Sequence, residues 1–244
     1  MIALTIGLAV FVGIALGLLG GGGSILTVPL LAYVAGMDAK AAIATSLLVV
    51  GVTSAIGAVS HARAGRVQWR TGLVFGAAGM AGAYAGGLLA RFIPGTVLLI
   101  GFAVMMIATA VAMLRGRRNV TAAAGEHRLP VPKIIAEGLV VGLVTGLVGA
   151  GGGFLVVPAL ALLGGLPMPV AVGTSLIVIA MKSFAGLGGY LTSVTLDWPF
   201  LLAVTGVAVL GALIGAALVN RVPDKALEKG FGWFVLAMGA AMLV

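Results

Sequence analysis

The sequence predicts an all-α polytopic membrane protein made of two homologous units. Three observations predict this class: a very apolar composition, several apolar runs long enough to cross a bilayer, and one internal repeat with a constant offset. Of the 244 residues, 61% are hydrophobic and 8% are charged, whereas soluble domains carry about 25% charged residues. A soluble protein of this composition would lack a polar surface, so we expect lipid to surround the chain.

Long apolar runs define the predicted spans. A helix that crosses a bilayer needs about 20 mainly apolar residues. The runs that approach this length are 39–61, 68–91, 95–115, 170–191, 198–219 and 226–244. None of them alternates apolar and polar residues as the strands of a membrane β-barrel do. We therefore expect helices.

The internal repeat relates the two halves of the chain. The sequence GLLGGGGSILTVP at 17–29 recurs as GLVGAGGGFLVVP at 146–158, an offset of 129 residues. The same offset, without a gap, pairs Trp69 with Trp198, Gly82 with Gly211, Pro94 with Pro223, and Phe102 with Phe231. Matched Trp, Pro and Gly positions at one register indicate a duplication. The predicted organisation is a first transmembrane repeat at 1–115, a basic linker at 116–133, and a second repeat at 134–244.

The first segment of each unit is interrupted by glycines. Residues 2–36 are apolar but contain the run 20–23, four consecutive glycines, and then Pro29. As one straight helix the segment would be about 50 Å long, more than a bilayer requires. Irregular backbone at membrane depth persists only where protein buries it or water reaches it. The break therefore lines a cavity or joins the two arms of a re-entrant hairpin, and residues 135–165 pose the same choice.

The distribution of Lys and Arg favours the hairpin and, with it, inverted repeats. If the first segment crosses fully, the units are parallel and the loop Lys and Arg residues divide 8 to 5 between the two sides. If the segment returns to its own side, each unit keeps three spanning helices, the units are inverted, and the division is 11 to 2. Cytoplasmic loops carry an excess of Lys and Arg, so the inverted arrangement fits better. Both arrangements place the 116–133 linker in the cytoplasm.

The two glycine clusters are the first candidate substrate-binding elements. A half-helix that starts inside the membrane presents free N–H groups and a positive dipole end to an anion, and we expect such starts near Ser24 and Phe154. The alternative is close helix packing through small residues. The predicted binding residues of these elements are Gly20, Gly21, Gly22, Gly23 and Ser24 in the first unit and Gly149, Gly151, Gly152 and Gly153 in the second.

Lys182 is the one basic residue deep within a predicted span. A charge at the bilayer centre costs about 2.5–3.5 kcal/mol on insertion scales, so such residues are candidates for function. Its counterpart in the first unit is Thr53, and the sequence offers no deep acidic residue to pair with it. We expect Lys182 to bind the substrate anion. The alternative is a side chain that extends to the membrane surface.

Two Thr-Ser pairs complete the predicted site. Thr45-Ser46 and Thr174-Ser175 occupy matching positions in the helix that follows each broken segment. Their hydroxyl groups are able to donate hydrogen bonds to an oxyanion. The alternative is a hydrogen bond from each hydroxyl back to its own helix, which is common in membrane helices.

The remaining polar residues indicate neither an enzyme nor a metal site. The chain has no cysteine and two histidines, and we expect no catalytic residue, metal or cofactor. His61 lies beside an arginine-rich loop and is expected to be a solvated helix-end residue. Glu137 is expected near the interface, with a role in proton coupling left open. We expect the net charge of +8 to set topology and contact anionic lipid headgroups, with no nucleic-acid partner.

The paired glycine motifs, each followed by Pro and then by a Thr-Ser helix, resemble the TauE/SafE sulfite-exporter family of the TSUP superfamily of membrane transporters. The resemblance runs from Gly17 to Phe102 and again from Gly146 to Phe231. It implies a secondary carrier for a sulfur oxyanion or organosulfonate, such as sulfite or sulfoacetate. Ala150 replaces the glycine found at position 21 of the first copy, a small departure from the paired motif.

These observations predict a multi-pass secondary transporter that moves a small anion across the cell inner membrane by alternating access, with its site between the two glycine breaks. The expected partners are the anionic substrate and the lipid bilayer, with a proton or Na⁺ as candidate coupling ion. The alternatives are an anion channel, a carrier for another small carboxylate or oxyanion, and a scaffold subunit. The sequence leaves the substrate, the transport direction, the coupling ion and the oligomeric state open.

Overall fold

The structure is a computed structural model of the chain, and its described part is helical, as predicted. It describes residues 2–19, 24–114, 131–148, 156–157, 160, 166, 168–218, 233 and 236. The elements are α1 (Ile2–Leu19), α2 (Ser24–Pro29), the π-helix η1 (Leu30–Val34), α3 (Ala39–Arg63), α4 (Trp69–Leu89), the 3₁₀ turn η2 (Ala90–Phe92), α5 (Gly95–Leu114), α6 (Val131–Val148), α8 (Met168–Tyr190) and α9 (Trp198–Leu218).

Four of the described helices have the length and composition of membrane spans: 39–63, 69–92, 170–190 and 198–215. Each matches a predicted run, which confirms the all-α polytopic class. Shorter apolar helices cover 7–17, 95–108 and 135–148. The structure describes only residues 233 and 236 of the predicted span at 226–244, and only residues 131–133 of the linker at 116–133.

Local chemistry sets the ends of α3. The Asp38 carboxylate accepts a hydrogen bond from the Lys40 N–H (3.0 Å) and so caps the start of the helix, because a side-chain oxygen satisfies an otherwise unpaired N–H group there. After Arg63 the chain reverses through Gly65, whose φ of +68° favours glycine. This short turn makes α4 antiparallel to α3.

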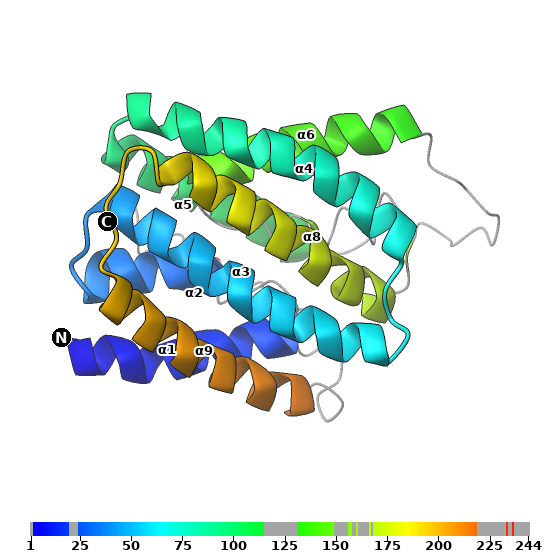
Figure 1. The fold of residues 1–244 in the computed structure, drawn as a ribbon, viewed down its shortest axis with the longest axis horizontal. Coiled ribbons are helices and arrows are strands. Elements are labelled where there is room, and N and C mark those ends of the chain that lie inside the picture. Colours follow the sequence, from blue (N-terminus) through cyan, green and yellow to red (C-terminus); the bar gives the residue numbers. More distant parts are fainter. Residues whose placement is uncertain are drawn as a thin grey trace.

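The helices form a layered bundle whose order interleaves the two units. Figure 1 shows α6, α4, α8, α3, α9 and α1 following one another across the molecule, with α5 behind, and the same neighbours are in contact. The first helix of each unit therefore packs on a helix of the other unit: α1 lies against α9, and α6 lies against α4. The two predicted repeats do not form two separate packing units.

Corresponding helices of the two units run in opposite directions. Leu47, early in α3, lies 3.4 Å from a Cβ added at Gly186, late in α8. Leu176, early in α8, lies 3.4 Å from a Cβ added at Gly57, late in α3. The two helices are therefore antiparallel. In Figure 1, α4 and α9 also run in opposite directions across the bundle. Inverted repeats require corresponding helices to run in opposite directions, as α3 and α8 do here. The orientation of the two units in a membrane stays a prediction.

Glycines at matching positions make the interleaved contacts close. A Cβ at Gly82 of α4 would overlap the Leu139 carbonyl oxygen of α6, and a Cβ at Gly211 of α9 would overlap the Val10 carbonyl oxygen of α1. The two contacts are related by the offset of 129 residues. Small residues let membrane helices approach this closely. The same close helix contact therefore occurs at one glycine of each unit. These two glycines serve helix packing.

The described arms of the first broken segment lie side by side. Val12 and Leu16 of α1 form a buried cluster with Leu30 of η1. In Figure 1 the N-terminus and the start of α3 lie at the same end of the bundle. Since η1 leads directly into α3, both arms extend from that end, which agrees with the hairpin alternative. The glycines 20–23 between the arms lie outside the described residues.

The outer surface is apolar and the interior holds polar groups. Phe11, Val140 and Leu202 are each more than 60% exposed, as suits side chains that face lipid. Trp69 and Trp198 are half exposed at the first turns of α4 and α9. Because α4 and α9 run in opposite directions, these two residues lie at opposite ends of the bundle, where interfacial anchors are expected.

Candidate anion site

Lys182 is fully enclosed near the middle of α8. Its side chain is 1% exposed, and Gly79 of α4 makes room for it: a Cβ at that position would lie 2.5 Å from the Lys182 Cδ. Its Nζ lies 3.5 Å from the Thr145 hydroxyl oxygen of α6. A side chain that extended to the membrane surface would not be enclosed in this way. The enclosed position of Lys182 therefore argues against the alternative of a side chain that extends to the membrane surface, and its role in binding stays a prediction.

The surroundings of Lys182 contain no acidic partner within the part of the chain that the structure describes. Asp38 and Asp197 precede α3 and α9 and lie at the end of the bundle. Glu137 lies eight residues before Thr145 on α6, about 12 Å along the helix. An enclosed ammonium without a carboxylate favours an anionic ligand, because a buried charge is costly unless it is paired.

The Thr-Ser pairs are buried, and their hydroxyls contact the protein itself. The Ser46 hydroxyl donates to the Ile43 carbonyl oxygen (2.8 Å), and the Ser175 hydroxyl donates to the Val172 carbonyl oxygen (2.7 Å). These are the back-bonds of the structural alternative. The Thr174 hydroxyl oxygen accepts from the Gln68 N–H at 2.9 Å and so joins α8 to the start of α4.

The structure does not bring the two Thr-Ser pairs together. Antiparallel packing of α3 and α8 puts Thr45 and Thr174 at opposite ends of the helix pair, about 20 Å apart along its axis. Lys182 lies between them, roughly 12 Å from Thr174 on the same helix. A single small anion is unable to contact Lys182 and both pairs in this arrangement.

The glycine clusters of the predicted site fall outside the described residues. This applies to 20–23 in the first unit and to 149–153 in the second. The helix α2 begins at Ser24, where a half-helix start is expected. The end of α1 reaches the middle of the bundle, because Leu16 and Gly17 line a cavity together with Thr53 of α3.

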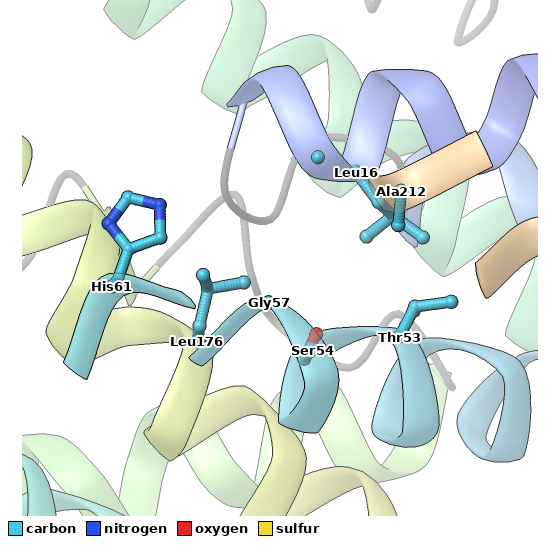
Figure 2. Close-up of a pocket in the computed structure, with 8 residues that line it drawn as sticks. Leu16, Thr53, Ser54, Gly57, His61, Leu176 and Ala212 are labelled. Carbon is cyan, nitrogen blue, oxygen red and sulfur yellow. The ribbon is translucent and has the colours of Figure 1, made fainter. Parts of the chain in front are cut away.

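That cavity is a feature that sequence reasoning missed. Figure 2 shows it between α3, α1, α8 and α9. Its volume is about 10 Å³, enough for about one water molecule. Its polar lining comes from α3 alone, as Thr53, Ser54 and His61.

His61 lies in the last turn of α3, as predicted, but the prediction that its side chain is solvated is wrong. Its side chain is 8% exposed. The helix α3 continues to Arg63, and Gly173 of α8 packs so closely that an added Cβ would lie 3.1 Å from the His61 Cβ. A usable signal was present in the sequence, since the repeat offset aligns His61 with the aromatic Tyr190 of a predicted span.

Taken together, the long apolar helices, the apolar outer surface and the buried polar side chains define a polytopic membrane protein. The described residues contain no group of three His, Cys, Asp or Glu side chains able to hold a metal ion.

Comparison with known proteins specifies the family. Residues 5–242 match the family model described as "Sulfite exporter TauE/SafE". The chain belongs to this family of membrane transporters. The predicted family and the prediction of a transporter instead of an enzyme are confirmed.

Several bacterial relatives are similar over nearly their whole length. A protein of Xylella fastidiosa named "Probable membrane transporter protein" is 35% identical over 96% of this chain and 92% of its own. YdhB of Bacillus subtilis, with the same description, is 29% identical over 89% of this chain and 90% of its own. "Sulfite exporter TauE/SafE family protein 3" of Arabidopsis thaliana is 30% identical over 52% of this chain and 28% of its own. No solved structure is significantly similar to the chain.

Proposed function

We propose that this protein is a secondary carrier that moves a small sulfur oxyanion or organosulfonate, of the sulfite or sulfoacetate type, across the inner membrane. The observation that carries the proposal is the enclosed Lys182 ammonium, which has no acidic partner among the described residues. The family description and the name of the Arabidopsis relative support the substrate class.

The mechanism that fits this fold is alternating access by two inverted units. Inverted-repeat carriers place their site near the membrane midplane and expose it to one side at a time. Lys182 and its counterpart Thr53 both lie where α3 and α8 cross, which is the centre of the interleaved bundle. We place the end of the bundle that bears Arg63, Arg66 and Arg70, with the 116–133 linker, on the cytoplasmic side.

Anion uptake into proteoliposomes tests the proposal. Purified protein is reconstituted, and uptake of sulfite, thiosulfate, sulfate, sulfoacetate and taurine is measured with and without a pH or Na⁺ gradient. Saturable uptake that is accelerated by unlabelled anion on the opposite side identifies a carrier. Flux without counterflow acceleration would identify a channel. Flux of carboxylates alone would show that the substrate is a carboxylate and not a sulfur anion.

The variant Lys182→Met tests the role of the ammonium. Methionine has a similar length and no charge. Loss of a buried charge contact costs about 2–5 kcal/mol, so we expect the half-saturating anion concentration to rise by about thirtyfold or more. The control is Lys40→Met, because the Lys40 ammonium donates to the Arg91 carbonyl oxygen (3.1 Å) at the end of the bundle. Unaltered uptake by Lys182→Met would remove Lys182 from the site.

A further inference from the structure

Three helices surround the Lys182 side chain. Figure 1 shows α4 between α6 and α8, and α4 contacts both of them. Lys182 belongs to α8, Gly79 of α4 lies beside the stem of its side chain, and Thr145 of α6 lies next to its ammonium group. The position of the ammonium therefore depends on residues from two neighbouring helices.

The corresponding positions of the duplication lack this combination. The offset of 129 residues pairs Lys182, Thr145 and Gly79 with Thr53, Leu16 and Ala208. Where the lysine is replaced by a short side chain, the hydroxyl group is replaced by an apolar leucine and the glycine by an alanine. The charge, the hydrogen-bond acceptor and the space for a long side chain thus occur together on one side of the repeat. This joint difference indicates that the surroundings are built to hold the lysine.

Gly79 provides the space for the lysine stem. A Cβ at Gly79 would lie 2.5 Å from the Lys182 Cδ and 2.9 Å from the Lys182 Cγ. The next nearest atom is the Gly138 carbonyl oxygen, at an ordinary contact distance of 3.5 Å. The lysine side chain is therefore what excludes a methyl group at this position. An alanine here would push the stem aside and move the ammonium with it.

The Thr145 hydroxyl is oriented to accept a hydrogen bond from Lys182. A hydroxyl group has one proton to donate, and Thr145 donates its proton to the Gly142 carbonyl oxygen, 3.1 Å away on the same helix. The hydroxyl oxygen then remains as an acceptor for the Lys182 Nζ, at the long distance of 3.5 Å. With its proton used in this way, Thr145 holds the ammonium and does not itself donate to an anion.

The ammonium keeps donors for a ligand. A lysine ammonium has three N–H groups, and Thr145 is the one acceptor within hydrogen-bonding distance of the Nζ in the described part of the chain. A flexible side chain that is already held in place loses less freedom when a ligand binds, which favours affinity. The contacts with Gly79 and Thr145 thus set where the free N–H groups lie.

We propose that Thr145 and Gly79 are positioning residues for the Lys182 ammonium: Gly79 admits the stem, and Thr145 fixes the charged end. The proposal rests on the proposed binding of the substrate anion by Lys182 and adds the residues that place its charge. Neither residue touches the anion. Changes at both positions are therefore expected to weaken binding without lowering the maximal transport rate.

The variants Thr145→Val and Thr145→Ser test the hydroxyl group. Uptake of sulfite and of sulfoacetate into proteoliposomes is measured over a range of concentrations. Valine keeps the shape without the acceptor, so we expect the half-saturating concentration to rise about fivefold, as for the loss of one hydrogen bond. Serine keeps the hydroxyl and is expected to restore the natural value. The matched control is Thr205→Val, because the buried Thr205 hydroxyl also donates to its own helix, to the Leu201 carbonyl oxygen at 2.7 Å.

A double variant separates positioning from a general role in packing. If Thr145 acts through the lysine, Thr145→Val is expected to cause no further rise in the half-saturating concentration once Lys182→Met is present, whereas independent effects would add. Gly79→Ala is expected to raise the half-saturating concentration in the natural background. Its control is Gly206→Ala, where an added Cβ has nothing within 4 Å. Size-exclusion chromatography checks folding, and Thr145→Ala replaces Thr145→Val if the valine variant does not fold.

The outcomes separate the positioning role from the transport function. An unchanged half-saturating concentration in Thr145→Val, a fall in maximal rate in its place, or a full additional effect beside Lys182→Met would overturn the role of Thr145 and leave the carrier intact. An unchanged value in Gly79→Ala would overturn the role of Gly79. Absence of saturable uptake by the folded natural protein, for every anion tested, would overturn the proposed function itself.

Discussion

At the scale of single residues, the two copies have kept the same positions and changed their chemistry. Where the first unit has Thr53 and His61, the second has Lys182 and Tyr190. Lys182 brings a charge into a part of the protein where a charge is costly. Tyr190 brings a hydroxyl that ties α8 to α6. The side chains at these equivalent positions, more than the backbone around them, make the two halves of the transporter different.

The hydroxyl of Tyr190 is expected to contribute to stability. In Tyr190→Phe the Leu147 carbonyl oxygen loses its 2.5 Å donor while the aromatic ring stays in the core. Removing a buried hydrogen bond costs about 0.5–1.5 kcal/mol, so we expect a lower midpoint of thermal unfolding in detergent. Tyr84→Phe is the matched control, because Tyr84 is 46% exposed. An equal midpoint for both variants would show that this bond does not hold α8 to α6.

At the scale of helices, close packing through glycine joins the units. The helices α1 and α6 each pack on a helix of the other unit, α1 on α9 and α6 on α4. Hydrophobic burial gives little preference for this, because lipid is as apolar as the helix surfaces, and close van der Waals contact decides association instead. The glycines 13, 82, 142 and 211 all lie in these two contacts.

A methyl group in one of these contacts is expected to separate the helices. In Gly211→Ala the added Cβ would overlap the Val10 carbonyl oxygen of α1, and overpacking costs about 1–3 kcal/mol. Gly206→Ala on the same helix adds a methyl group with nothing within 4 Å and is expected to be neutral or slightly stabilising. Thermal unfolding in detergent compares the two. Similar midpoints would contradict the α1–α9 contact described here.

At the scale of the whole molecule, the two units are expected to face opposite sides of the membrane. The loops after α3 and α8 are equivalent in the repeat, and they contain Ala64 and Ser193, both exposed. With inverted units, a membrane-impermeant maleimide should label Ala64→Cys only from the cytoplasmic side and Ser193→Cys only from the external side. Intact cells and inside-out vesicles give the two measurements, and the cysteine-free natural chain is the blank. Labelling of both cysteines from one side would establish parallel units.

The sequence by itself determined the class and the duplication. A chain with so few charges has to satisfy its backbone hydrogen bonds internally in lipid, which leaves helices as the structure of its long runs. Trp69, Gly82 and their partners at one offset established the repeat without any contact being known. The position of Lys182 in the middle of an apolar run was also evident from the sequence.

The tertiary structure alone decided which residues meet. The two Thr-Ser pairs match in sequence, yet antiparallel packing of α3 and α8 separates them, because corresponding positions of antiparallel helices diverge with distance from the crossing point. His61 is near a loop in sequence, yet α8 covers it through Gly173. Burial and cavities depend on side chains from helices far apart in the chain, and a repeat offset does not specify how two copies interleave.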